Sequence, residues 1–125
     1  MNRKLIILLM FVFIALYGCK DNKKCKVTLI EIMSSSSCEE CVTTYKPMVD
    51  ELKKEFTKDV KFLIYDTGTD EGVKMANKYG VTKLPTFIFL DKEGVEYFRM
   101  KDIIIKDAMA AIINAKLNES NGNKR

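Results

Sequence analysis

The chain has 125 residues, of which 47% are hydrophobic and 30% are charged, a composition that fits one small globular domain. It contains no histidine, so a Ser-His-Asp triad and a zinc site with histidine ligands are both excluded. The 21 Lys and Arg residues barely outnumber the 17 Asp and Glu residues, and they are scattered along the chain rather than gathered in a stripe. We therefore expect no nucleic-acid partner.

Residues 1–18 have the pattern of a bacterial export signal. Two basic residues at positions 3 and 4 precede an unbroken apolar run over 5–16. A helix of that length reaches only about 18 Å, short of the roughly 30 Å hydrocarbon core of a membrane, which favours a cleaved signal over a permanent span.

The Leu-Tyr-Gly-Cys sequence at 16–19 resembles the lipobox of bacterial lipoproteins, in which the cysteine becomes the acylated first residue. We predict a lipid anchor on Cys19, at the extracytoplasmic face of a membrane. The alternatives are an ordinary secreted protein or an uncleaved anchor, with Cys19 as a spare thiol.

The remaining residues predict a short tether followed by one domain. Residues 19–26 are polar and charged, as suits a tether. Val27–Met33 is β-branched and mostly apolar, which is typical of a strand buried on both faces. Further strands are expected over 60–65, 86–90 and 95–100, and helices over 38–58, 70–79 and 105–117. The predicted domain therefore covers 27–117 in the order β-α-β-α-β-β-α, and the polar residues 118–125 form a disordered tail.

Cys38 and Cys41 form a C-x-x-C motif at the start of a predicted helix. Two cysteines three residues apart on a helix share one face and can form a disulfide. Ser37 and Glu40 fit the helix capping box, and the positive end of the helix dipole favours a thiolate at Cys38. The same spacing occurs in half of a zinc site. Because only Cys25 could be added and histidine is absent, we expect no metal.

Other motifs accompany the C-x-x-C pair at fixed places in the predicted order of elements. They are Pro47 within the first helix, Asp66 after the second strand, the segments 78–81 (Lys-Tyr-Gly-Val) and 84–86 (Leu-Pro-Thr), and Glu93-Gly94 in the hairpin. Together they resemble the thioredoxin family over roughly residues 26–117. The resemblance implies an α/β fold in three layers, α/β/α, around a mixed four-stranded sheet.

The resemblance also implies a thiol-disulfide oxidoreductase that requires no cofactor. Cys38 would attack a substrate disulfide and Cys41 would resolve the mixed disulfide. The Leu84–Pro85 bond would be cis and would turn the backbone of Leu84 towards the substrate, the alternative being an ordinary trans turn. Glu31 is a candidate for the buried acid that helps to deprotonate Cys41, although it is one position out of register and could equally face solvent.

The expected partners are disulfide-containing exported proteins and an electron donor in the membrane, with the domain acting as a monomer. Glu39 and Glu40 stand between the cysteines, and their negative charge opposes the Cys38 thiolate, which favours a reductant over an oxidant. Alternatively, the two glutamates only stabilise the helix start.

Two departures from the family pattern and one left-over cysteine limit what the resemblance implies. Ser37 stands where thioredoxins have tryptophan, and Pro47 follows Cys41 by six positions instead of five, which indicates one inserted residue. Cys25 is left over, and it could be incidental, pair with another chain or act as a relay to Cys38. The chain could instead be a non-catalytic surface lipoprotein with a structural C-x-x-C clip, or a metal-binding protein that uses three of its cysteines.

Overall fold

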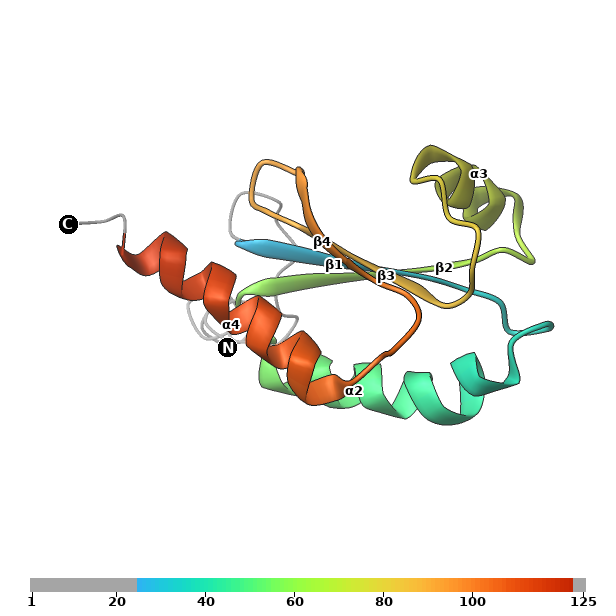
Figure 1. Ribbon diagram of the computed structural model, residues 1–125, viewed down its shortest axis with the longest axis horizontal. Helices are drawn as coiled ribbons and strands as arrows, with labels where there is room; N and C mark the ends of the chain where they lie inside the picture. Colours follow the sequence, from blue (N-terminus) through green and yellow to red (C-terminus); the bar gives the residue numbers. More distant parts are fainter. Residues whose placement is uncertain (1–24, 123–125) are drawn as a thin grey trace, which may run out of the picture.

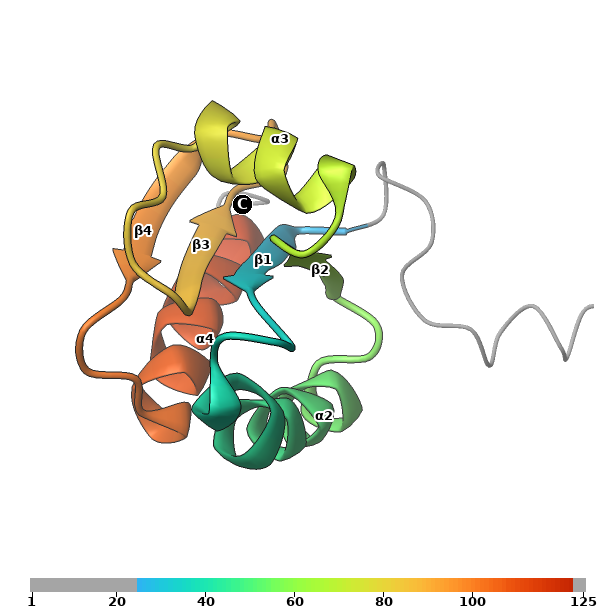
Figure 2. The same cartoon turned by 90° about the vertical axis from the view of Figure 1, so that its right-hand side faces the viewer.

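A four-stranded sheet lies between helices on both of its faces in the computed structural model, which describes residues 25–122 (Figures 1 and 2). The elements are β1 (Val27–Met33), the π-helix η1 (Cys41–Tyr45), α2 (Lys46–Glu55), β2 (Val60–Asp66), α3 (Asp70–Lys78), β3 (Thr86–Leu90), β4 (Glu96–Met100) and α4 (Lys106–Gly122). The predicted order of elements and the mixed four-stranded sheet are confirmed.

The strands are arranged in the order β2-β1-β3-β4, so β1 lies inside the sheet. It pairs with β2 in parallel, from Val27 opposite Val60 to Met33 opposite Asp66. It pairs with β3 in the antiparallel direction, and β4 completes the antiparallel hairpin predicted from the sequence. The carboxyl ends of β1 and β2 and the amino end of β3 therefore meet at one edge of the sheet.

Alternate residues of β1 face two different hydrophobic cores. Val27 and Leu29 pack with α2 and α4, whereas Ile30 and Ile32 pack on the side of α3. Figure 1 shows α2 and α4 together on one face and α3 alone on the other. Both faces of β1 are thus buried, as its apolar sequence predicts.

A π-helical turn interrupts the helix that the sequence predicts over 38–58. The backbone N–H of Lys46 donates to the carbonyl of Cys41, five residues earlier, and α2 then begins with Pro47 in its first turn. Cys41 and Val49 would lie about 80° apart around a continuous α-helix. The extra residue in the turn removes this offset, so both side chains are buried, with exposed fractions of 0% and 2%. The inserted residue that the position of Pro47 indicates therefore lies in the π-helical turn that begins at Cys41.

The two ends of the described chain differ from the sequence predictions. Helix α4 continues to Gly122, so the prediction of a disordered tail from residue 118 is wrong over that stretch. Hydrogen bonding supports the extension, because Lys26 Nζ donates to Asn121 Oδ1 over 2.9 Å. Cys25 is only 4% exposed, so the end of the predicted tether packs against the domain.

The predicted signal segment at 1–18 and the predicted lipidation site at Cys19 lie outside the described residues. Between residues 25 and 122, none of the helices has the length and apolar character needed to cross a membrane.

Candidate active site

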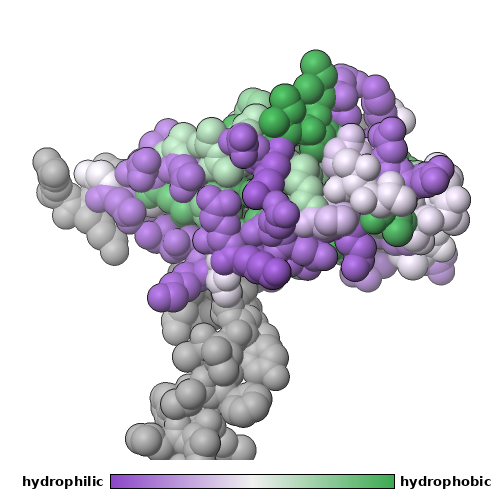
Figure 3. All heavy atoms as spheres, turned by 90° about the horizontal axis from the view of Figure 1, so that it is seen from below, coloured by the Kyte–Doolittle hydropathy of each residue, from purple (hydrophilic) through white to green (hydrophobic). Residues whose placement is uncertain are grey.

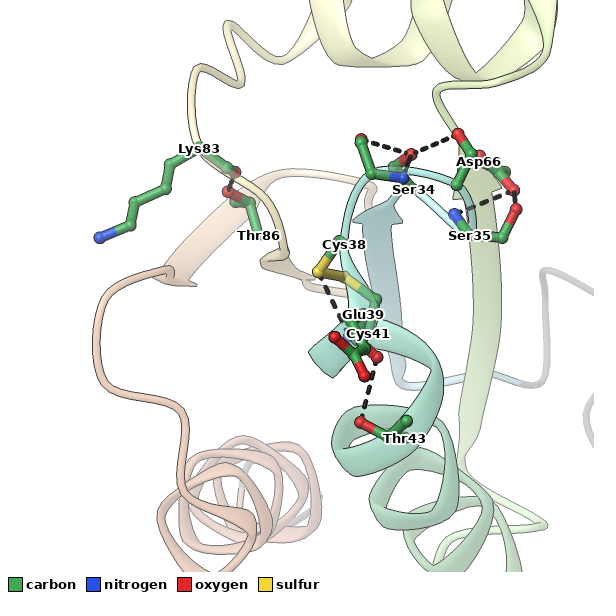
Figure 4. The surroundings of a disulfide bond; sticks show 11 residues. Ser34, Ser35, Cys38, Glu39, Cys41, Thr43, Asp66, Lys83 and Thr86 are labelled. Carbon is green, nitrogen blue, oxygen red and sulfur yellow. Dashed lines mark hydrogen bonds between the residues drawn. A yellow bond between two sulfur atoms is a disulfide. The ribbon is translucent and has the colours of Figure 1, made fainter.

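Cys38 and Cys41 are joined by a disulfide bond, with their Cα atoms 5.3 Å apart. Cys38 is partly exposed at the end of the loop that follows β1, whereas the Cys41 side chain is fully buried. The backbone N–H of Cys41 donates to Cys38 Sγ over 3.2 Å (Figure 4). Cys38 is therefore the more accessible residue of the pair, and a donor already points at the place where negative charge on its sulfur would develop.

The segment Leu84–Thr86 lies beside the disulfide. The Leu84–Pro85 peptide bond is cis, as the resemblance implies, and the Pro85 side chain is buried. Thr86 Oγ1 donates to the carbonyl of Lys83 over 2.6 Å, which fixes the turn that enters β3 (Figure 4). The turn that precedes the cis bond is thus fixed, and Figure 4 shows Lys83 and Thr86 to one side of Cys38.

A second segment, between β4 and α4, borders the same end of the sheet. Lys83 Nζ forms a 2.6 Å ion pair with Asp102 Oδ1, which ties this segment to the turn before Pro85. Ile103 and Ile105 follow, with exposed fractions of 75% and 53%. Figure 3 shows hydrophobic atoms gathered at one edge of an otherwise mostly hydrophilic face. Apolar surface is therefore available on the segment tied to the turn beside the disulfide.

Glu31 is buried beneath the helix that carries Cys41, with an exposed fraction of 3%. It lies on the α2 and α4 side of β1, directly opposite Phe87 of β3, and the Phe87 ring meets Tyr45 of η1 edge-on at 6.3 Å. Burial raises the pKa of Glu31 to about 7, an effect that the positive charge of Lys53 opposes and the negative charge of Asp50 reinforces. The alternative that Glu31 faces solvent is wrong.

The buried polar residues of the described chain are gathered around this site. Only three polar or charged side chains between residues 25 and 122 are buried, namely Glu31, Ser34 and Thr86. Glu31 and Ser34 lie at the carboxyl end of β1, and Thr86 begins β3. Because burying a polar side chain is unfavourable, the presence of all three residues at this end of the sheet makes it the candidate site.

Comparison with known proteins agrees with this geometry. A family model described as a thioredoxin-like domain matches residues 16–117. The chain belongs to the thioredoxin-like domain family. A chloroplastic M-type thioredoxin of pea, Pisum sativum, is 34% identical over 73 residues, which cover 58% of this chain and 38% of the pea protein. The chain thus spans less than two fifths of that relative's length.

Solved structures of thioredoxins share the fold. A thioredoxin-2 of a malaria parasite has a TM-score of 0.63 and 24% identity, covering 72% of this chain and 82% of the parasite protein. An exposed lipoprotein thioredoxin of Streptococcus pneumoniae has a TM-score of 0.60 and 22% identity, covering 75% and 87% of the two chains. The three-layer fold inferred from the sequence is confirmed.

The start of the C-x-x-C motif in this thioredoxin-like domain is not capped as predicted. The Ser37 hydroxyl donates to Ser34 Oγ over 2.7 Å, and the N–H of Cys41 donates to Cys38 rather than to Ser37. Glu40 occupies the N-cap position of η1 and makes no capping bond with its side chain. Glu39 and Glu40 are both exposed, so two carboxylates flank the disulfide on its solvent side. The sequence analysis therefore predicted the right residues at the motif, but the wrong hydrogen bonds for Ser37 and Glu40.

Asp66 is a residue of the site whose contact the sequence analysis missed. It lies at the end of β2, where Oδ2 accepts hydrogen bonds from the N–H and hydroxyl of Ser35 and Oδ1 accepts one from the N–H of Gly68 at 2.8 Å. The bond from the Ser35 side chain, and then that from the Gly68 backbone, hold the pKa of Asp66 below its usual value. The sequence showed that Asp66 follows a predicted strand and that four serines precede Cys38. It did not show that Asp66 and Ser35 are in contact.

Cys25 lies far from this site. It precedes β1 and Cys38 follows it, so the seven-residue strand, about 23 Å long, separates the two residues. A relay from Cys25 to Cys38 and a metal site built from the three cysteines are therefore wrong. In the part of the chain from 25 to 122, no group of three or more potential metal ligands comes together.

Proposed function

We propose that this thioredoxin-like domain reduces disulfide bonds of exported proteins through Cys38 and Cys41. One observation carries the proposal: within one disulfide, Cys38 is a partly exposed residue, while Cys41 is fully buried. Such an asymmetric pair gives one thiol that can meet a protein substrate and one that can only act on its neighbour.

The reaction starts from the dithiol form. The Cys38 thiolate attacks one sulfur of the substrate disulfide, forming a mixed disulfide, and the other substrate sulfur leaves as a thiolate that takes up a proton. The Cys41 thiol then loses its proton and attacks Cys38 Sγ, which re-forms the Cys38–Cys41 bond and releases the second substrate sulfur. Two electrons have passed to the substrate. A dithiol protein in the membrane returns the domain to its reduced form.

Glu31 supplies the base for the second step. Its carboxyl lies on the sheet face covered by the helix of Cys41, and a pKa of about 7 lets it change protonation near neutral pH. A buried carboxylate that accepts the Cys41 proton would make the thiolate in a place that water does not reach. Leu84 offers its backbone to the substrate chain as an added strand.

We further propose that Cys19 carries the lipid anchor. The support is the lipobox-like sequence at 16–19 and the description of the pneumococcal relative as an exposed lipoprotein. Since β1 is about 23 Å long, an anchor that precedes Lys26 leaves the disulfide facing away from the membrane. In the full chain, Cys19→Ala should block both processing and lipid attachment, as mass spectrometry can show. A mature protein without lipid mass, or one with Cys19 in a disulfide, would refute the anchor.

The cysteine variants test the reaction. In the full chain, Cys38→Ser should abolish reduction of a protein disulfide such as that of insulin, because the attacking thiol is gone. Cys41→Ser should accumulate substrate bound to Cys38, since nothing resolves the mixed disulfide. Glu93→Gln, in the exposed turn between β3 and β4, serves as the control and should do neither.

If Cys38→Ser accumulated a mixed disulfide with the substrate and Cys41→Ser did not, then Cys41 would be the attacking cysteine and Cys38 the resolving one. A Cys38–Cys41 couple with a midpoint potential below about −300 mV and no exchange with glutathione would instead identify a structural clip.

A further inference from the structure

Four consecutive serines, Ser34–Ser37, lead into Cys38, and the proposed reaction uses none of them. A serine run of this kind normally forms a flexible loop. Here the segment, called the serine segment below, is held by hydrogen bonds at two separate points. One point lies within the segment, and the other is a carboxylate from the neighbouring strand (Figure 4).

The internal point is Ser34, whose side chain is 2% exposed. Ser34 Oγ accepts from the N–H of Ser37 over 3.1 Å and from its hydroxyl over 2.7 Å. The carbonyl of Ser34 accepts the N–H of Cys38 over 3.1 Å. The backbone of the attacking cysteine is therefore tied to the residue that follows β1.

The external point joins Ser35 to Asp66. Asp66 Oδ2 accepts both the N–H and the hydroxyl of Ser35, which comes from a part of the chain 31 residues away. In Figure 4 these two residues lie on the opposite side of Cys38 from Lys83. The contact thus braces the serine segment on the side of the disulfide away from the turn before Pro85.

Asp66 is itself held firmly enough to act as an anchor. Its Oδ1 accepts the N–H of Gly68 over 2.8 Å, and its carbonyl accepts the hydroxyl of Thr69 over 2.7 Å. Gly72 of α3 packs so closely that an added Cβ would lie 1.7 Å from the Asp66 carbonyl oxygen. The start of α3 therefore fixes Asp66, and Asp66 in turn fixes Ser35.

We propose that Ser35 and Asp66 are positioning residues, which hold the serine segment so that the Cys38 sulfur is aimed at the substrate disulfide. The inference rests on the proposed function, because it concerns the first step of that reaction. Attack on a disulfide requires alignment of three sulfur atoms, so a loosened segment lowers the fraction of molecules ready to react. Neither residue touches the substrate, and both act through the position of Cys38.

The test compares loss of the contact with its conservative replacement in the full chain. The rate constant for reduction of insulin should fall about tenfold in Ser35→Ala and in Asp66→Asn, because positioning rather than thiol chemistry is lost. Ser35→Thr keeps a hydroxyl and should stay within about twofold of the parent. Alkylation of Cys38 by iodoacetamide, which needs no alignment with a second disulfide, should slow much less than insulin reduction.

Asp91→Asn is the matched control. Asp91 Oδ1 also accepts two backbone N–H groups, from Glu93 at 2.9 Å and Val95 at 3.0 Å, but in the turn between β3 and β4 at the other end of the sheet. It should lower the free energy of unfolding about as much as Asp66→Asn while leaving the insulin rate within about twofold. Equal slowing by both variants would show a general loss of stability and refute the positioning role.

The outcomes also separate this inference from the proposed function. Insulin reduction at the parental rate by Ser35→Ala, together with inactive Cys38→Ser, would overturn only the positioning role. Insulin reduction by Cys38→Ser would overturn the proposed function. If Asp66→Asn fails to fold, Ser35→Ala and its Thr counterpart decide the matter, because they alter an exposed side chain.

Discussion

Glu31 lies directly opposite Phe87 in the antiparallel pair of β1 and β3, which places a carboxyl group on an apolar face of the sheet. Two charges of the described chain bear on it, those of Lys53 and Asp50, and they act in opposite directions. Burial dominates and raises the pKa of Glu31 to about 7. This single residue therefore links the stability of the domain, its pH dependence and the proton transfer of the proposed reaction.

Glu31→Gln should make the oxidised domain more stable at pH 8 than the parent. The folded parent keeps the Glu31 proton up to a pKa of about 7, whereas the unfolded chain loses it near 4.5, so the parent binds more protons when folded. The stability contributed by this group is complete below pH 4.5 and is lost as the pH rises through 7. The variant has no such loss. Between pH 4.5 and pH 8, the free energy of unfolding of Glu31→Gln, measured with urea, should increase relative to that of the parent by roughly 3 kcal/mol.

Glu93→Gln, in the exposed turn between β3 and β4, is the control for this measurement. It removes the same charge without altering a buried group, so its effect on unfolding should be similar at both pH values. A Glu31→Gln protein that follows the pH dependence of the parent would contradict a buried acid at this position.

Glu31→Gln should also slow the step in which Cys41 resolves the mixed disulfide. In the parent, this rate should rise through pH 7 as Glu31 becomes able to accept a proton, and the amide cannot replace it. We expect at least about a tenfold slower resolution at pH 7 and no rise near that pH. Acid quenching followed by mass spectrometry measures the surviving mixed disulfide.

Glu51→Gln provides the comparison, since Glu51 lies on α2 but is exposed and paired with Lys106 at 2.7 Å. Its resolution rate should keep the pH profile of the parent. Equal profiles for the two glutamine variants would remove Glu31 from the reaction and leave it only a destabilising buried acid.

Gly72→Ala should destabilise the domain by at least about 2 kcal/mol, because the added methyl group would collide with the backbone of Asp66. Gly122→Ala makes the same chemical change in a helix where nothing lies within 4 Å of the new Cβ. That variant should be unchanged or slightly stabilised, given the better helix propensity of alanine. Thermal unfolding of both proteins checks the difference, and a stable Gly72→Ala protein would show that α3 can move away from Asp66.

Local sequence patterns were sufficient for the elements and for the cysteine motif. Val27–Met33 and Thr86–Leu90 are apolar runs bounded by polar or turn residues, and both strands have the predicted bounds. The cis bond before Pro85 was implied by the resemblance to thioredoxins rather than by the local pattern, and the structure has it. The burial of Glu31 was harder to predict, because a strand with two buried faces has no alternation of polar and apolar residues.

Contacts between distant segments could not be predicted from local patterns. Ser35 and Asp66 are 31 residues apart, and neither local sequence predicts the hydrogen bond between them. Ser37 fits a helix cap because the capping box is a local pattern, but in the folded chain its side chain bonds to Ser34 instead of to the helix start. The π-turn at Cys41 was visible only as a wrong spacing to Pro47.

Replacement of Glu39 and Glu40 by glutamine should make the cysteine couple less reducing. Both carboxylates are exposed next to Cys38, and neither forms an ion pair with another residue of the described chain, so no side-chain cation there neutralises the charge that opposes the thiolate. Removing it stabilises the reduced form. We expect the midpoint potential to rise by on the order of 10–30 mV, where 30 mV corresponds to about 1.4 kcal/mol for two electrons.

Solvent screening keeps this effect small, so the glutathione titration belongs at low ionic strength, and the rise should shrink as salt is added. Glu93→Gln at the other end of the sheet is the control: at 0.1 M salt, where the Debye length is roughly 10 Å, it should leave the potential unchanged, and at low salt it should change the potential less than the double variant does. An unchanged or more negative potential in the double variant would mean that the two glutamates serve only the helix start. The preference for reduction over oxidation would then lose its support in the charge pattern, because no other charged side chain stands between the two cysteines.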